Sequence, residues 1–203
     1  MRHFIDSSKG VTPFVVLALM AYFHRWDNPT LWIYLALHGT YGVLWVLKSA
    51  IFPDRTWEQE VRAPMGAGIW FSLALYWSAP LIIAWRDVRA PAWYLGCCVA
   101  MYAFGVFLHF ASDMQKHTAL ALRPGLITDG LFRYSRNPNY FGELLIYLGF
   151  GLLAMHWFPP LVLGTFVIGF WLRRMRDKDK SLSRHPEFAA YKARTALFIP
   201  FVF

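Results

Sequence analysis

The chain alternates long apolar runs with short polar segments, a pattern typical of a protein that crosses a membrane several times. It lacks the alternation of short strands and helices that marks a soluble dinucleotide-binding fold. About 20 apolar residues cross a bilayer as a helix, so the shortest runs need flanking residues to span. We therefore predict an all-α integral membrane protein with about six transmembrane helices, around residues 11–23, 31–52, 66–85, 92–111, 138–158 and 161–172.

The basic residues predict how these helices are oriented. Of the 20 lysines and arginines, 17 fall on the side that holds both termini and the second and fourth loops, and only Arg25, Arg86 and Arg89 fall on the other. Because cytoplasmic loops carry an excess of positive charge, both termini are predicted to be cytoplasmic, in a multi-pass protein of the inner membrane. The same rule accounts for the net charge of +8 without a nucleic-acid partner.

Several common chemistries have no support in the sequence. Cys97 and Cys98 are adjacent, so they cannot form an ordinary structural disulfide with each other, and no metal-ligand spacing is present. The glycines form no phosphate-cradling loop, and there is no serine nucleophile motif or HExxH. We therefore predict no metal site.

The stretch Gly130–Glu143, GLFRYSRNPNYFGE, concentrates polar chemistry at the start of an apolar run. Pro138 disfavours helix at the preceding residue and is itself a favoured first helical residue, so a helix is predicted to begin there. Its first turn would present Asn139, Tyr140 and Glu143 at the mouth of a membrane segment.

Arg133 and Arg136 precede this turn, and the free N–H groups at a helix N-terminus bind anions. Polar groups at membrane depth usually mark a functional site. The alternative is a basic loop that caps a helix, with Glu143 offsetting the helix dipole.

A second polar group lies at the end of the fourth predicted span. His109 and Asp113 are four residues apart and share a helix face, with Lys116 one turn further on. This pair could hydrogen-bond a ribose or a base, or could equally be a helix end with a paired carboxylate. In the basic tail that begins at Arg173, Phe188, Tyr191 and Leu197 are predicted to dock the tail onto the helices.

The second half of the chain resembles a known superfamily. SRNPNYFGE is similar to the R-[HN]-P-N-Y-x-G-[ED] signature of the sterol reductases, SDMQK and LITDGLFRY resemble the segment upstream of it, and the C-terminal IPF resembles the 5α-reductase ending. Arg176-Asp177 occupies the place of a reductase Arg-Asp pair. The superfamily includes steroid 5α-reductases, sterol reductases, isoprenylcysteine carboxyl methyltransferases and phospholipid methyltransferases.

The resemblance implies that residues 109–203 form a cytoplasmic NADPH site and that residues 1–108 supply the substrate-side helices. It implies that Asp113 contacts the adenosine end and that Arg176 binds a phosphate or ribose. Asn139, Tyr140 and Glu143 would line the dinucleotide towards the nicotinamide, and Glu143 is also a candidate catalytic residue. The full set of cofactor-binding candidates is His109, Asp113, Lys116, Arg133, Arg136, Asn139, Tyr140, Glu143, Arg176 and Tyr191.

In the first half, the segment from Lys48 to Pro53 can be aligned with a reductase R-x-x-x-Y-P pattern. The catalytic tyrosine of that pattern then falls on Trp45, which cannot donate a proton in the same way. Tyr41 lies one helical turn away and is the candidate acid in its place.

These observations predict an NADPH-dependent reductase that acts on a conjugated C=C bond of a lipophilic substrate, steroid-like or isoprenoid-like, which enters from the bilayer lipids. The alternative is an S-adenosylmethionine-dependent methyltransferase of the isoprenylcysteine carboxyl or phospholipid type. Those enzymes typically carry a Glu-Glu pair in the tail, where this chain has Asp177-Lys178-Asp179-Lys180. A third possibility, a non-enzymatic membrane protein, rests on Trp45. The oligomeric state does not follow from the sequence.

Overall fold

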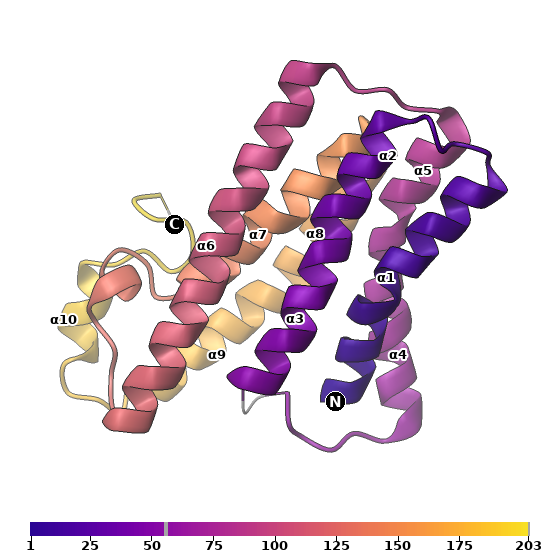
Figure 1. Cartoon of the computed structure of the whole chain (residues 1–203). Coiled ribbons are helices and arrows are strands. Elements are labelled where there is room, and N and C mark those ends of the chain that lie inside the picture. The colour runs from indigo at the N-terminus through magenta and orange to yellow at the C-terminus, as the bar shows by residue number, and fades with distance from the viewer. Residues whose placement is uncertain (55–56, 203) are drawn as a thin grey trace. The chain divides into compact units, whose positions relative to one another are not determined.

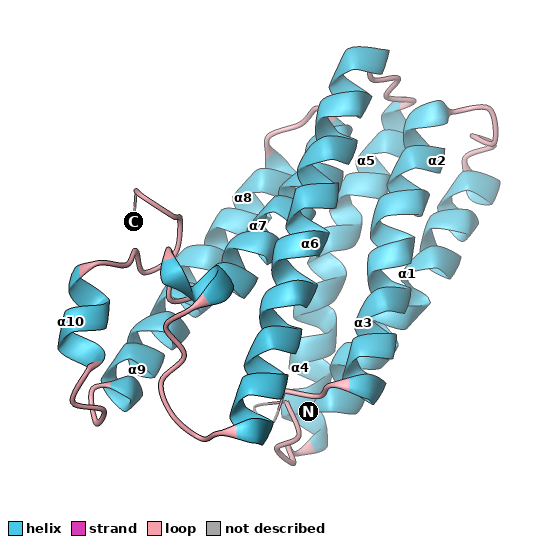
Figure 2. Ribbon diagram, turned by 60° about the vertical axis from the view of Figure 1, so that its left-hand side comes forward, coloured by secondary structure: helices cyan, strands magenta, loops and turns pink. Residues whose placement is uncertain are grey.

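A computed structural model describes residues 1–54 and 57–202, so the charge counted at Arg55 and the terminal Phe203 lie outside it. The described residues form helices and loops (Figure 2), with one isolated parallel pairing of Ser135 and Ala196. The predicted all-α fold is confirmed for this part of the chain.

Four of the described helical segments are long and apolar enough to cross a membrane, and they coincide with the first four predicted spans. They are Arg2–Tyr22, Pro29–Ile51, Ala63–Arg86 and Ala92–Leu122. The fifth predicted span falls on α7, Pro138–Gly151, which has 14 residues. The sixth falls on α8, Phe158–Phe166, and the π-helical turn Val167–Trp171 after it. The total of six spans stays a prediction.

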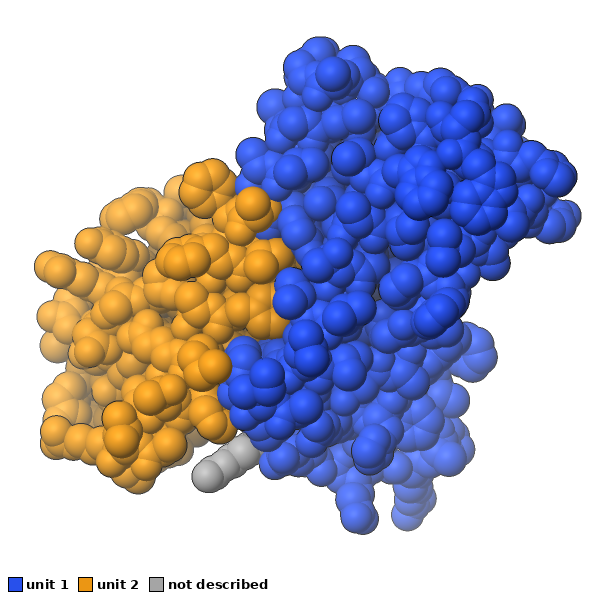
Figure 3. Space-filling model, in the orientation of Figure 1, with its two compact units in different colours: residues 1–102, 147–163 blue, residues 103–146, 164–203 orange. Residues whose placement is uncertain are grey.

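The chain folds as two compact units (Figure 3), each built from two stretches of sequence. Unit 1 comprises Met1–Tyr102 and Tyr147–Leu163, and unit 2 comprises Ala103–Ile146 and Gly164–Phe203. The helices α6 (Ala92–Leu122), α7 and α8 each contribute to both units.

Unit 1 is a group of antiparallel helices. It contains α1 (Arg2–Tyr22), α2 (Pro29–Tyr34), a π-helical turn (Leu35–Gly39), α3 (Thr40–Ile51), α4 (Ala63–Ala74), a 3₁₀ turn (Leu75–Trp77) and α5 (Ser78–Arg86). Figure 1 shows α1 and α3 side by side. At one end of the unit the backbone N–H of Arg2 donates to the carbonyl of Trp57, and at the other Arg25 donates to the carbonyl of Ala84.

The first helix begins earlier than predicted. Its apolar run starts at Val11, but α1 begins at Arg2 and buries Ile5, Ser8 and Lys9. The polar lead is helical because its side chains find partners on α3, Asp6 through Ser49 (2.9 Å) and Lys9 through Tyr41 (2.9 Å). Such partners offset the cost of burying polar groups.

A polar cluster ties the α1–α2 loop to the α5–α6 loop. Asn28, fully buried, caps α2 by accepting from the Leu31 N–H and also donates to the Asp87 carboxylate at 2.8 Å. This hydrogen bond, followed by Arg89 and Arg25, holds the pKa of Asp87 below its usual value. Asp87 takes a left-handed conformation (φ 49°), which an aspartate tolerates better than most residues.

We expect Asn28→Ala to lower the free energy of unfolding by about 1–3 kcal/mol near neutral pH, because both the cap and the bond to Asp87 are lost. A depressed carboxyl pKa stabilises the fold above the unfolded value of about 3.9 and loses that effect as pH falls through the folded pKa. The deficit should therefore shrink as pH falls below about 4, measured by thermal unfolding in detergent. Asn28→Asp, which keeps the capping oxygen, should retain the α2 cap; an equal deficit at every pH would contradict the link to Asp87.

Unit 2 contains the second part of α6, a 3₁₀ turn (Gly130–Arg133), the first part of α7, α9 (Leu172–Leu182) and α10 (Phe188–Ala193). The predicted helix start at Pro138 is confirmed. The long polar region after residue 111 is partly helical, because α6 continues to Leu122, and the first part of the basic tail is α9. Both helices continue past the end of their apolar runs, and hydropathy alone does not predict where a helix ends in polar sequence.

Candidate functional site

Two glycines let α6 and α7 touch through their backbones in unit 2. A Cβ on Gly105 would lie 2.7 Å from the carbonyl oxygen of Gly142, and a Cβ on Gly142 would overlap the backbone of His109. Only residues without a side chain permit this approach. Gly142, the glycine of the NPNYFG stretch, therefore seats the first turn of α7 directly against α6.

This contact brings together residues that are 30 positions apart in the sequence. His109 Nδ1 lies 3.0 Å from the backbone carbonyl of Asn139, and since a carbonyl only accepts, Nδ1 carries the proton. On the other side of the ring, Nε2 lies 3.9 Å from the Asp113 carboxylate. Both side chains are buried. The prediction that His109 and Asp113 share one helix face is confirmed, and the start of α7 contacts His109 through Asn139.

The remaining predicted residues of this region lie on the first turns of α7 and near the end of α6. Asn139, Tyr140 and Glu143 are half-buried, and the Tyr140 ring lies 5.5 Å from that of Trp171. Lys116 is half-buried on the last turns of α6. Next to it, Gln115 accepts a hydrogen bond from the Leu131 N–H and donates to Asp129, which fastens the loop before the motif to α6.

Arg136 holds a position that sequence reasoning did not anticipate. Its guanidinium forms a two-pronged ion pair with Asp179 of α9, at 3.0 Å from Nε and 3.0 Å from Nη2. Nη1 donates to the carbonyl and hydroxyl of Thr195. Arg136 and Asp179 are both more than nine-tenths buried. The structure thus places Arg136 at the joint between the motif and the tail, with its donors directed at protein groups.

The neighbours of Arg136 fasten the same joint. Ser135 donates to the carbonyl of Phe198, and Asn137 donates to that of Leu197. Lys178 of α9 donates to the backbone carbonyl of Arg136 at 2.8 Å and to Asn137 Oδ1 at 3.0 Å. The first part of the motif, Ser135–Asn137, therefore holds the C-terminal tail, while the second part, from Asn139, faces α6. The signal for this role is Asp179, one of three acidic residues in a mainly basic tail, together with Asp177 and Glu187.

Tyr191 belongs to the same joint. Its hydroxyl donates to the carbonyl of Phe132 at 2.7 Å, and burial raises its pKa to about 12, so it stays a neutral donor at physiological pH. Phe188 and Tyr191 are both buried, which confirms them as anchors of the tail. A direct contact of Tyr191 with a cofactor stays a prediction.

The exposed charges of unit 2 suit a phosphorylated ligand. Arg133 and Arg176 present exposed guanidiniums, and the tail adds further exposed basic side chains. Guanidiniums bind phosphates in two-pronged fashion, and buried carboxylates such as Asp113 accept from ribose hydroxyls. Arg133 and Arg176 therefore have the chemistry to bind phosphate, and Asp113 and Asn139 have the chemistry to hydrogen-bond a sugar or a base.

Tyr41, the predicted acid, lies in unit 1 and is fully buried. Its hydroxyl accepts a hydrogen bond from Lys9 Nζ at 2.9 Å, and the same ammonium donates to Tyr147 at 3.2 Å. The Trp45 ring lies against this ammonium at 3.6 Å. The sequence had assigned Lys9 to topology and Tyr147 to a membrane span, so both were missed.

Other buried polar rings continue this cluster. His38 stacks on Phe150 with centroids 4.0 Å apart, and its Nδ1 lies 2.6 Å from the Tyr34 hydroxyl. His38 belongs to the π-helical turn Leu35–Gly39, and such turns occur often at functional sites. The signal in the sequence is a histidine and several tyrosines inside apolar runs.

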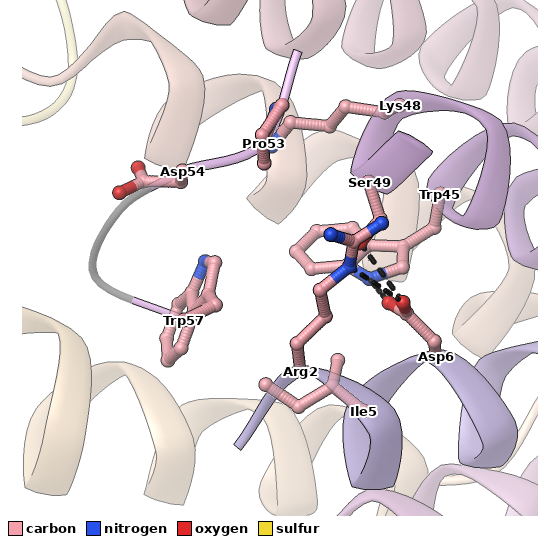
Figure 4. A pocket seen from close by; sticks show the side chains of 9 residues that line it. All are labelled: Arg2, Ile5, Asp6, Trp45, Lys48, Ser49, Pro53, Asp54 and Trp57. Carbon is pink, nitrogen blue, oxygen red and sulfur yellow. Dashed lines mark hydrogen bonds and ion pairs between the residues drawn. The ribbon is translucent and has the colours of Figure 1, made fainter. Parts of the chain in front are cut away.

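A small pocket, with a volume of about 10 Å³, opens beside this cluster in unit 1. Figure 4 shows Asp6 on one side of the pocket, where the carboxylate accepts from Ser49 (2.9 Å), Trp45 Nε1 (3.1 Å) and Arg2 (3.4 Å). Lys48 and Trp57 also line it. None of the predicted site residues lines this pocket, but Trp45 forms part of its wall and also covers Lys9.

Fold and geometry define an all-helical protein with several helices apolar enough to cross a membrane and with buried polar clusters inside them. Comparison with protein families refines this class. Residues 68–195 match the family described as "Protein of unknown function (DUF1295)", and the chain belongs to this family.

The curated relatives are fungal proteins without an assigned activity. Uncharacterized protein C7D4.09c of Schizosaccharomyces pombe is 34% identical over 70 residues, which cover 32% of this chain and 24% of that protein. Uncharacterized protein C594.04c of the same organism is 30% identical over 92 residues, 42% of this chain and 26% of that protein. The matches thus span about a quarter of the length of each relative. No solved structure matches the chain.

Proposed function

We propose that this protein is a membrane-embedded NADPH-dependent reductase that acts on a conjugated C=C bond of a lipophilic substrate. The observation that carries the proposal is the contact between α6 and the first turn of α7. It gathers His109, Asp113 and Asn139, residues that the resemblance to the steroid 5α-reductase-like superfamily assigns to the cofactor. Membership of the DUF1295 family, which is associated with that superfamily, supports the same assignment.

Bound NADPH would supply the hydride, leaving as NADP⁺, while water would supply the proton that completes the new CH–CH unit. In unit 2, the exposed Arg133 and Arg176 would neutralise phosphate charge, and Asp113 would accept from a ribose hydroxyl. Glu143, half-buried on the first turns of α7, would accept from the nicotinamide carboxamide. Arg136 contributes indirectly, because its pairing with Asp179 fastens the tail that carries Arg176.

In unit 1, Tyr41 would act on the substrate. A phenol that donates a hydrogen bond to the carbonyl oxygen of an enone draws electrons from the conjugated bond and favours hydride addition. The lipophilic substrate would enter from the bilayer. The charge asymmetry supports an orientation with both termini in the cytoplasm, where NADPH is available, in the inner membrane.

Ligand-dependent thermal stability in detergent tests the cofactor. We expect NADPH to raise the melting temperature more than NADH does, because the 2′-phosphate adds a charged contact, and at 100 times its Kd to stabilise by about 2.7 kcal/mol. S-Adenosylhomocysteine, which lacks phosphates, should have little effect at the same concentration. Arg176→Ala should weaken NADPH binding on the order of 10-fold, the loss typical of one charge-assisted hydrogen bond.

The matched control is Arg184→Ala, which removes another exposed tail guanidinium, one that donates to Ser181 three residues earlier. It should leave NADPH affinity nearly unchanged, which separates a specific contact from the general basic charge of the tail. Stabilisation by S-adenosylhomocysteine without stabilisation by NADPH would replace the reductase by a methyltransferase. If neither ligand acts, the enzyme proposal fails.

A further inference from the structure

Lys9 is a buried charge in a helix long and apolar enough to cross a membrane. Its side chain is 5% exposed, and it lies about two turns from the start of α1. An ammonium at such a position is costly to bury, and ionisable groups there usually serve a function. What Lys9 contacts therefore indicates what it does.

The direction of its hydrogen bonds is settled by chemistry. A lysine ammonium has three donors and no acceptor, so in the 2.9 Å bond the Tyr41 oxygen accepts. The proton of the Tyr41 hydroxyl must then point away from Lys9. The same holds for Tyr147 at 3.2 Å. Lys9 thus sets the rotation of the Tyr41 O–H bond.

Aromatic rings hold the ammonium in place. The Trp45 ring centre lies 3.6 Å from Lys9 Nζ, and that of Tyr41 lies 4.3 Å away. Trp45 is itself fixed by its hydrogen bond to Asp6. Attraction between a cation and the faces of these rings strengthens when water is excluded. The charge is therefore held at one position relative to the Tyr41 oxygen.

The backbone contact between α1 and α3 also helps to place Lys9 next to Tyr41. A Cβ on Gly42 of α3 would overlap the carbonyl oxygen of Lys9, so only glycine lets α1 lie this close to α3. Gly42 is the residue next to Tyr41. The close approach of the two helices thus occurs at the point where Lys9 meets Tyr41.

We propose that Lys9 is the positioning residue of Tyr41. It holds the Tyr41 oxygen as an acceptor and stabilises the negative charge that grows on this oxygen as the phenol donates its proton towards the substrate carbonyl. This role rests on the proposed reductase function, in which hydride reaches one alkene carbon, water protonates the other and leaves hydroxide, and the enol returns its O–H proton to the Tyr41 oxygen. The inference adds Lys9 of α1 to the residues of unit 1 that act with Tyr41 of α3.

The first test needs no substrate. The C–O stretching band of a tyrosine reports whether its hydroxyl accepts or only donates, and the Tyr41 band is isolated by infrared difference between isotope-labelled wild type and Tyr41→Phe. We expect an acceptor-type band in the wild type that shifts in Lys9→Met. Lys48→Met is the matched control, because Lys48 is another buried lysine that faces the Trp45 ring, at 4.7 Å. A Tyr41 band unchanged by Lys9→Met overturns the proposal.

A second variant keeps the test decisive if Lys9→Met fails to fold. Gly42→Ala keeps Lys9 but forces α1 away from α3, so it should also shift the Tyr41 band. Gly68→Ala is its control, since a Cβ at Gly68 meets nothing within 4 Å. A Gly42→Ala protein with the wild-type band would show that the spacing of the two helices does not orient Tyr41, against the proposal.

The third measurement links position to chemistry. Consumption of NADPH is followed with long-chain alkyl enones and 4-en-3-one steroids as probes. We expect Lys9→Met to lower kcat about 100-fold or more, the usual contribution of a positioned acid, with the KM for NADPH within about twofold. An unchanged kcat overturns the positioning role while the reductase function stands. If NADPH neither binds nor is consumed in the wild type, the proposed function fails, and the catalytic role of Lys9 fails with it.

Discussion

Replacing Asp179 with alanine is expected to lower the free energy of unfolding by about 3–5 kcal/mol, the typical cost of removing one partner from a buried ion pair. The variant leaves the Arg136 guanidinium buried without the carboxylate that binds it at 3.0 Å through two nitrogens. The loss should appear in thermal unfolding in detergent. It should also release the tail, since Arg136 links the motif both to α9 and to Thr195.

The control is Asp177→Ala, two residues earlier on the same helix. Asp177 is exposed and pairs with Lys180 at 3.6 Å, so its removal should change stability by less than about 0.5 kcal/mol. Replacing both partners, Arg136→Met with Asp179→Leu, should recover much of the loss, because apolar side chains do not require charge pairing. If Asp179→Ala lowers the free energy of unfolding no more than Asp177→Ala does, the ion pair of Arg136 with Asp179 does not stabilise the fold. The predicted role of Arg136 in phosphate binding would then regain support.

Gly142→Ala is the second change with a large expected effect. Its Cβ would overlap the backbone of His109 and lie 2.7 Å from the carbonyl of Gly105, and backbone cannot move aside as a flexible side chain can. We expect a loss of about 1–3 kcal/mol or more in unfolding free energy. Because α7 must move off α6, Asn139 should separate from His109, and NADPH affinity should fall more than stability alone explains.

Gly164→Ala provides the comparison. Gly164 lies in α8, another apolar helix, and a Cβ there meets nothing within 4 Å. Alanine favours helix over glycine by up to about 1 kcal/mol, so this variant should be neutral or stabilising and should bind NADPH normally. Isothermal titration with NADPH, at a temperature where both variants remain folded, measures the difference. A Gly142→Ala protein with normal stability and normal affinity would contradict the close contact of α6 and α7.

Part of the candidate site could be predicted because its signals are local. Pro138 marks the start of α7 through the geometry of a single residue, and this prediction is confirmed. His109 and Asp113 share a face because helical spacing brings residues four apart together. The tail anchors Phe188 and Tyr191 are large side chains in a polar segment, and both are buried as predicted.

Other parts depend on contacts between distant segments. Arg136 looked like a phosphate ligand because it stands at a helix N-terminus, but the structure pairs it with Asp179, 43 residues away. Lys9 looked like a topological charge because it lies next to an apolar run, but a tyrosine 32 residues further on receives its hydrogen bond. No local rule predicts such partners, because the sequence around a charged residue does not determine which distant segment will pack against it.

The sequence by itself determined that the chain is helical and apolar enough to cross a membrane, and where its most polar motif begins a helix. These properties follow from hydropathy and from backbone geometry, which act within a few residues. Only the tertiary structure decided which polar groups stabilise the fold by pairing with distant residues, such as Arg136 with Asp179. It assigned Arg136 to the tail and Lys9 to Tyr41, because helices packed through Gly42 and Gly142 bring backbones into contact and decide which buried charge finds which partner.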